Sequence, residues 1–220
     1  DLHSFPLRRS SDLGLPNCFN TGSGPFGIVN YKGTPASPGV PASPGYLGSI
    51  AAYSRPSPII FNPTAPTLVL TYAETELLLA DAAKRWGIGG APKTHYDNGV
   101  LAGITMLSAY GDAGAISDED AQAYLDANPY DDANGLKQIN TQYWITTFFD
   151  EYEAWSNYRR TGFPLLKPVT YTGSQSLGAI PRRMNYSTTE KQINASNYDK
   201  AVAGLPGGDK ITSRIWWDIQ

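Results

Sequence analysis

The stretch Q-Y-W-I-T-T-F-F-D-E-Y-E-A-W-S-N-Y-R-R-T-G-F-P, residues 142–164, decides the expected fold of this chain. Up to Tyr158 it contains no Gly or Pro, and its apolar side chains recur at the spacing of a helix. Asn134 is suited to cap the start of this helix, and Gly162 followed by Pro164 is a strong stop signal. We therefore expect one long helix that is apolar around most of its circumference and lies inside a packed helical body.

The aromatic side chains of this helix are expected to pack in the core or between helices rather than to bind a ligand. These side chains are Trp144, Phe148, Phe149, Tyr152 and Trp155.

The charged end of the same helix is expected to form a fixed corner. Arg159 and Arg160 fall in the last turn, where cations interact favourably with exposed carbonyl groups. Glu153 lies two helical turns before Arg160, so charge pairing that holds the corner is favoured over proton transfer.

Four further segments have helical patterns. A helix over residues 68–86 ends at a cluster of glycines, and Ser117 with Asp120 forms a capping box for a helix to residue 127. Thr94 and Asp97 predict another capping box. In the helix that follows it, Gly99 and Gly103 mark a close contact with a neighbouring helix. The remaining ranges are 95–110 for the helix that begins after Thr94, and 188–195 for a short helical turn.

The pattern predicts an all-α fold with substantial coil, because helices joined by loops show no alternation with strands. Residues 211–220 alternate well enough for an extended, strand-like tail that buries Trp216 or Trp217. We divide the chain into a leader at 1–13 that is suspected not to be native, an irregular segment at 14–66 packed on the helical body, and a helical region at 67–220.

Composition excludes several classes of function. The chain has 220 residues, 41% of them hydrophobic, and a net charge of −3 without a basic stripe, so nucleic acid is not an expected partner. Cys18 is the only cysteine, and His3 and His95 are the only histidines. A metal site and a cofactor are therefore not expected, and His95 is read as a solvent-exposed residue in the first turn of its helix.

The sequence favours a protein that is not an enzyme, so we assign no catalytic residue. A Ser-His-Asp triad would need His95 as its base, and no Gly-x-Ser-x-Gly elbow is present. Glycoside hydrolysis needs only two carboxylates, and the chain has two acidic clusters. Asp118, Glu119 and Asp120 are better explained as a solvated helix start, and Asp150, Glu151 and Glu153 by charge pairing with the nearby arginines that fixes the corner.

The candidate ligand contacts lie in the Pro/Gly-rich segment. Tyr31, Tyr46 and Tyr53 stand in nearly uncharged, irregular sequence where an aromatic ring has less core to fill. An exposed tyrosine can stack on the apolar face of a sugar ring while polar neighbours bind its hydroxyl groups.

Six motifs in this order resemble the SusD/RagB-like outer-membrane lipoproteins of Bacteroidetes, over about residues 68–218. They are Tyr72-Ala73-Glu74 with Leu77-Leu78-Leu79-Ala80-Asp81-Ala82-Ala83; Tyr96 with Gly99-Val100; Gln142-Tyr143-Trp144 with Glu153-Ala154-Trp155; Arg159-Arg160-Thr161-Gly162-Phe163-Pro164; Ile180-Pro181-Arg182-Arg183 with Tyr186, Glu190 and Asn194; and Trp216-Trp217-Asp218. We call Trp144, Glu153, Trp155, Arg159, Arg160, Gly162 and Pro164 the signature residues and assign them a structural role.

This resemblance implies tetratricopeptide-like helix pairs whose loops form a glycan-binding face. Such proteins lie at the outer surface of the outer membrane, cap a TonB-dependent, SusC-like porin and pass it oligosaccharides or polysaccharide fragments without catalysis. The chain departs from the family by lacking the N-terminal half, so membrane contact is expected only through a missing lipid anchor. Three alternatives stay open: a peptide-binding member of the family, a helical-repeat scaffold for proteins and, more distantly, a glycosidase.

Overall fold

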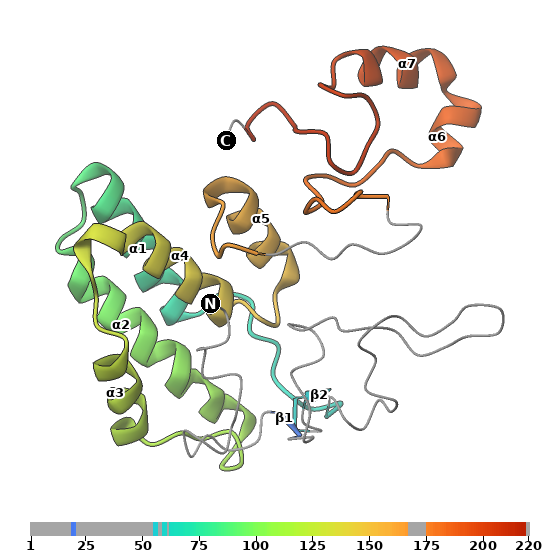
Figure 1. Ribbon diagram of the computed structural model, residues 1–220. Helices are drawn as coiled ribbons and strands as arrows, with labels where there is room; N and C mark the ends of the chain where they lie inside the picture. Colours follow the sequence, from blue (N-terminus) through green and yellow to red (C-terminus); the bar gives the residue numbers. More distant parts are fainter. Residues whose placement is uncertain (1–18, 21–54, 57–58, 61, 167–174, 219–220) are drawn as a thin grey trace. The chain divides into compact units, whose positions relative to one another are not determined.

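The computed structural model describes residues 19–20, 55–56, 59–60, 62–166 and 175–218, and this described part is built of helices (Figure 1). In chain order the elements are β1 (Phe19–Asn20), β2 (Arg55–Pro56), α1 (Tyr72–Trp86), α2 (Pro92–Thr105), the 3-10 turn η4 (Met106–Tyr110), α3 (Asp118–Ala127), the 3-10 turn η5 (Asp132–Asn134), α4 (Gly135–Thr146), α5 (Glu151–Thr161), α6 (Thr188–Ile193) and α7 (Ala195–Ala203). β1 and β2 are a short antiparallel pair. The prediction of an all-α fold is confirmed.

The described residues divide into two compact units, one ending at Ala154 and the other beginning at Trp155. The first contains α1 to α4, and the second contains most of α5 with α6, α7 and the C-terminal loop. The boundaries that we placed after residues 13 and 66 stay predictions, because residues 1–18 and 21–54 lie outside the described part.

α1 begins at Tyr72, four residues later than its apolar pattern suggested, because Thr71 and Glu74 form a capping box. The Glu74 amide donates to Thr71 Oγ1 at 3.1 Å, and the Thr71 amide donates to Glu74 Oε2 at 3.0 Å. The helix ends where predicted, at Gly87, whose left-handed φ of 67° suits glycine best.

α2 begins at Pro92, so the predicted capping box of Thr94 and Asp97 is wrong. Proline fits the first turn of a helix, where its missing amide leaves no bond unmade. The predicted close contact is confirmed, since a Cβ on Gly99 would lie 2.7 Å from Leu77 Cγ of α1. A Cβ on Gly103 would lie 2.8 Å from Thr146 Oγ1 of α4.

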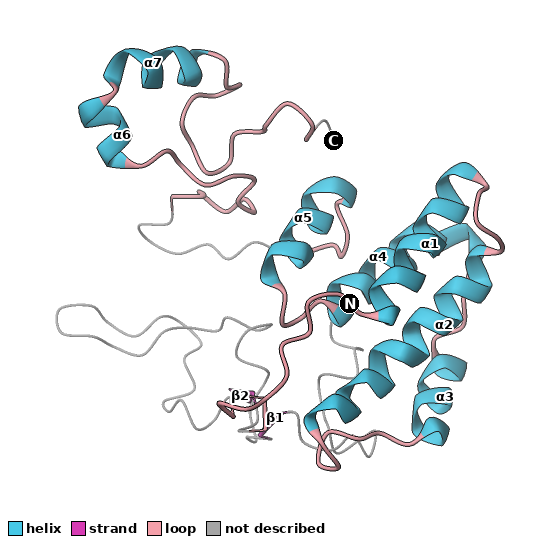
Figure 2. Cartoon of the chain, turned by 180° about the vertical axis from the view of Figure 1, so that it is seen from behind, coloured by secondary structure: helices cyan, strands magenta, loops and turns pink. Residues whose placement is uncertain are grey.

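α1, α2 and α4 lie side by side in both views, with α3 against α2 (Figures 1 and 2). Their shared core contains aliphatic side chains and three buried tyrosines. It comprises Leu77, Ala80, Tyr96, Val100, Tyr124, Leu125, Ile139 and Tyr143. The short connection between α1 and α2 gives the helix pair that the resemblance implied.

Asn140 and Gln142 of α4 form hydrogen bonds to neighbouring helices of this body. Asn140 of α4 donates to Asp81 Oδ1 of α1 at 2.7 Å, and Gln142 donates to the Tyr124 hydroxyl at 2.8 Å. Such bonds fix the register of helices, because a buried polar group left unpaired is costly.

The prediction of one long aromatic helix is wrong. The chain turns between Thr146 and Glu151, so α4 and α5 are separate helices. Thr147 Oγ1 donates to the Tyr143 carbonyl at 2.8 Å and ends α4, while Asp150 Oδ1 accepts the Glu153 amide at 3.1 Å and caps α5. Side chains of this kind compete for the hydrogen bonds of the helix backbone. The helix end between Thr146 and Glu151 was not predicted because no Gly or Pro marks it.

The predicted packing of the aromatic set is wrong in part for the same reason. Trp144, Phe148 and Trp155 are half-buried, whereas Phe149 is 37% exposed and Tyr152 is 76% exposed. The core position in this stretch is taken by Tyr143 instead.

The C-terminal region differs from its prediction. The short helical turn is present as α6, but α7 was missed, and residues 211–218 form turns rather than a strand. Trp216 is 90% exposed and Trp217 is exposed at 36%, while the neighbouring Asp218 is buried. The alternating pattern of residues 211–220 therefore does not correspond to a strand with a buried face.

Candidate functional site

The predicted ligand contacts Tyr31, Tyr46 and Tyr53 lie outside the described residues, so their part in a site stays a prediction. The signature residues lie within the described part.

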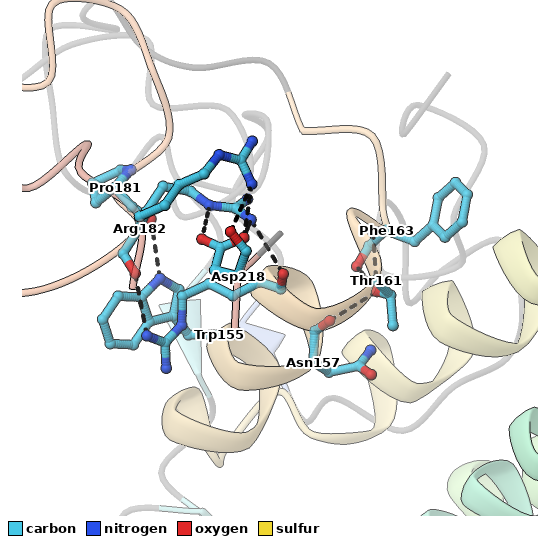
Figure 3. A network of polar contacts seen from close by, with 9 residues as sticks. Trp155, Asn157, Thr161, Phe163, Pro181, Arg182 and Asp218 are labelled. Carbon is cyan, nitrogen blue, oxygen red and sulfur yellow. Dashed lines mark hydrogen bonds and ion pairs between the residues drawn. The ribbon is translucent and has the colours of Figure 1, made fainter. Parts of the chain in front are cut away.

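The corner after α5 is closed by Thr161 and Gly162. Thr161 Oγ1 donates to the Asn157 carbonyl at 2.8 Å and accepts the Phe163 amide at 3.2 Å, as Figure 3 shows. Gly162 takes a left-handed φ of 76°, and Pro164 follows a cis peptide bond and is buried. The helix therefore stops where the sequence indicated.

The two arginines of α5 do not form the predicted pair with Glu153. Arg160 Nη2 donates to Asn157 Oδ1 at 2.7 Å, and Glu153 Oε2 accepts from the Tyr143 hydroxyl at 3.3 Å. Arg159 is the residue that joins the corner to the C-terminal loop.

The Arg159 guanidinium carbon lies 3.9 Å from the Trp155 ring centroid and 4.7 Å from that of Trp217. Its Nη1 donates to the Arg182 carbonyl at 3.1 Å. Burial lowers the pKa of Arg159, and the nearby Arg182 charge adds to this effect against the attraction of Asp218. The cation is thus stabilised by two aromatic faces, an arrangement suited to the planar guanidinium.

Arg182 and Asp218 form a buried ion pair beside this layer (Figure 3). Arg182 Nε donates to Asp218 Oδ2 at 2.6 Å, and Arg214 Nη1 donates to Oδ1 at 2.8 Å. Burial alone would raise the pKa of Asp218, but the hydrogen bond and charge of Arg182, with the charge of Arg214, outweigh it and lower that pKa below its usual range. The Asp218 hydrogen bond in turn raises the pKa of Arg182.

These contacts give the corner a structural role. Trp155 Nε1 donates to the Pro181 carbonyl at 3.2 Å, so α5 is tied to the segment that carries Arg182 (Figure 3). Arginines that bond carboxylates and carbonyls together hold a loop against a helix.

The acidic clusters also serve helix ends. Asp150 caps α5, and Ser117 Oγ accepts the Asp120 amide at 3.1 Å at the start of α3. Carboxylates near helix N-termini are stabilised by the exposed amides and the helix dipole.

His95 has a structural role that the sequence did not indicate, and the prediction that it faces solvent is wrong. Its Nδ1 lies 2.6 Å from Glu76 Oε2 of α1, and its Nε2 lies 2.9 Å from the Gly89 carbonyl. Both partners accept hydrogen bonds, so the arrangement is fully satisfied only when the imidazole carries both protons. The Glu76 hydrogen bond is the main cause that raises the pKa of His95.

No group of three or more metal-ligating side chains is found within the described ranges. Among the helices described, none is long and apolar enough to cross a membrane.

Comparison with known proteins gives one family match. The family model SusD-like_2, described as starch-binding and associating with the outer membrane, matches residues 28–187. No protein in the curated set matches the chain.

Solved structures resemble the chain over most of its length. A chitin-binding protein is 36% identical with a TM-score of 0.76, and the match covers 96% of this chain and 48% of that one. A SusD-like protein of Bacteroidetes AC2a is 27% identical with a TM-score of 0.69, covering 77% of this chain and 34% of that one. A SusD homolog from Bacteroides uniformis ATCC 8492 is 25% identical with a TM-score of 0.61, covering 80% of this chain and 41% of that one. The chain spans about half the length of these proteins or less.

Proposed function

The chain belongs to the SusD-like family, and on this premise we propose that it binds oligosaccharides and catalyses no reaction on them. The observation that carries the proposal is the match to a chitin-binding protein at 36% identity over 96% of this chain. The family description as starch-binding supports the same class of ligand. Starch and chitin are both polymers of glucose-configured rings, so such glycans are the first ligands to test.

A role without catalysis is supported by what the charged residues do. The most concentrated group of arginine, tryptophan and aspartate holds the corner after α5, where Asp218 is bonded by Arg182 and Arg214. Asp150 and Asp120 serve helix starts. An enzyme that cleaves glycosides needs two carboxylates placed on either side of a bond, whereas these aspartates bind arginines or cap helices.

The place of action and the partner are proposed from the family. We propose that the protein acts at the surface of the outer membrane, is held there by a lipid anchor, and passes its ligand to a TonB-dependent, SusC-like porin. The family description as associating with the outer membrane supports the location.

We also propose that Tyr31, Tyr46 and Tyr53 contact the ligand, since aromatic rings in irregular segments suit sugar stacking. Tyr46→Ala and Tyr53→Ala are expected to weaken glycan binding without changing the melting temperature. Wild-type affinity in both variants would remove these residues from the site.

The function is tested by calorimetric titration of the full-length gene product with chitin, starch and other oligosaccharides. Saturable heat without release of reducing ends is expected. Binding of peptides alone would favour the peptide-binding alternative, and a folded protein that binds neither class would favour a scaffold for other proteins. Turnover of a glycan that disappears in Glu153→Gln would show an enzyme.

A further inference from the structure

The turn that precedes the end of the described chain is held rigidly. The Asp218 amide donates to the Ile215 carbonyl at 3.0 Å, and the Asp218 side chain is bonded by Arg182 and Arg214. The next ring along, Trp217, lies beside the Arg159 guanidinium. Backbone and side-chain contacts therefore fix the positions on both sides of this turn.

Trp216 stands in this fixed turn and is 90% exposed, more than any other large apolar side chain in the described ranges. An exposed indole on a mobile segment would lose much conformational freedom when it binds a ligand. On a pinned turn that cost is small, because only the side-chain rotamer remains to be fixed.

Arg214, two residues before Trp216 in the chain, carries donors that suit a sugar ligand. The bonds of Arg214 to Asp218 both use Nη1, which leaves Nε and Nη2 without a partner among the described residues. The Arg214 side chain is 44% exposed. An apolar platform combined with a few polar donors is typical of sites that bind the C–H face and the hydroxyl groups of one ring.

We propose that Trp216 is a stacking platform for a glucose-configured pyranose ring, with Arg214 donating hydrogen bonds to its hydroxyl or acetamido oxygens. In this configuration the hydroxyl groups lie equatorial, so both faces of the ring present C–H bonds to an indole. This inference rests on the proposed function, because it places one sugar subsite of that function on the C-terminal turn.

Another exposed tryptophan, Trp86, has a different setting and provides a control. It lies on α1 with Tyr72 and Leu79, and this seven-residue spacing, two helical turns, is typical of a face that packs against another helix. Trp86 is 68% exposed, so its replacement removes a ring of the same size from the surface.

The experiment compares wild type, Trp216→Ala, Trp216→Phe and Trp86→Ala of the full-length gene product by calorimetry with chitohexaose and maltohexaose. Trp216→Ala is expected to weaken binding of at least one glycan by roughly ten- to one-hundredfold, the loss that follows when a large apolar contact is removed. Trp216→Phe is expected to keep part of the affinity and Trp86→Ala all of it, and the melting temperature of both Trp216 variants is expected to stay unchanged.

The outcomes separate this inference from the proposed function. If the wild type binds a glycan and the affinity of Trp216→Ala is within twofold of the wild-type affinity, the stacking platform is overturned and the proposed function stands. An equal loss in Trp86→Ala also overturns it, because the effect is then not specific to the turn. Absence of glycan binding by the wild type overturns the function and the platform together.

Discussion

Replacing Arg182 by Met removes the cation that pairs with the buried carboxylate of Asp218. The Asp218 side chain has no exposed surface, and the Arg182 side chain is 12% exposed. Breaking a buried ion pair by removing one partner costs about 3–5 kcal/mol. Arg214 remains bonded to Asp218 Oδ1 at 2.8 Å and is partly exposed, so we expect a loss near the lower end, about 3 kcal/mol. Methionine keeps the apolar stem, so the change isolates the charge.

Urea unfolding followed by tryptophan fluorescence and circular dichroism measures this loss. Asp218→Ala in the same background removes the stranded charge, so the double variant is expected to be more stable than Arg182→Met alone. Lys93→Met is the matched control, because Lys93 pairs with Asp97 as an exposed ion pair and its loss is expected to cost less than about 1 kcal/mol.

The pH dependence gives a second readout for Arg182→Met. The pKa of Asp218 is lowered in the fold, so the stability from its ionised form is present above the unfolded value of about 3.9 and is lost as pH falls through the folded pKa. The gap between wild type and Arg182→Met should therefore narrow at low pH. A variant within about 0.5 kcal/mol of wild type at pH 7, or losses that simply add in the double variant, would refute the reasoning.

Two further predictions concern the first unit. Glu76 and the Gly89 carbonyl raise the pKa of His95, so the stability that its protonated form contributes is full below about pH 6.5 and is lost as pH rises through the folded pKa. His95→Gln should remove this part of the pH dependence. A variant whose unfolding profile from pH 6 to 9 matches that of the wild type would contradict this prediction. Gly99→Ala places a Cβ 2.7 Å from Leu77 Cγ, so overpacking of about 1–3 kcal/mol should exceed the helix-propensity gain of about 1 kcal/mol; a melting temperature at or above wild type would show that α1 and α2 can separate without cost.

Local signals in the sequence were sufficient for the fold class and for several helix ends. Gly87 ends α1 with a left-handed φ, and Ser117 caps α3, because each acts through its own backbone or that of residues one turn away. The tight contact at Gly99 was also predictable from its place in a helical pattern.

Contacts between distant residues could not be predicted from pattern. Arg182 and Asp218 are 36 residues apart and His95 and Glu76 are 19 apart, and nothing in the spacing pairs them. The end of α4 depends on the Thr147 hydroxyl bonding to the backbone, an alternative that helix periodicity does not register. The aromatic content of residues 142–158 therefore overstated how much of that stretch would be buried.

For the candidate site, the sequence predicted the type of residue that would contact a ligand but not its place in the fold. Aromatic rings in irregular sequence pointed to Tyr31, Tyr46 and Tyr53, which lie outside the described residues. The alternation of residues 211–220 predicted a strand that buries Trp216 or Trp217, but both are exposed, because alternation with polar residues cannot distinguish a buried strand from a turn that exposes its rings.

Titration of the full-length gene product with chitohexaose and maltohexaose shows whether the protein binds glycans without cleaving them. We expect saturable heat for at least one of these glycans and no release of reducing ends after prolonged incubation. A folded protein that gives no heat with either glycan, or one that cleaves the glycan it binds, would contradict it.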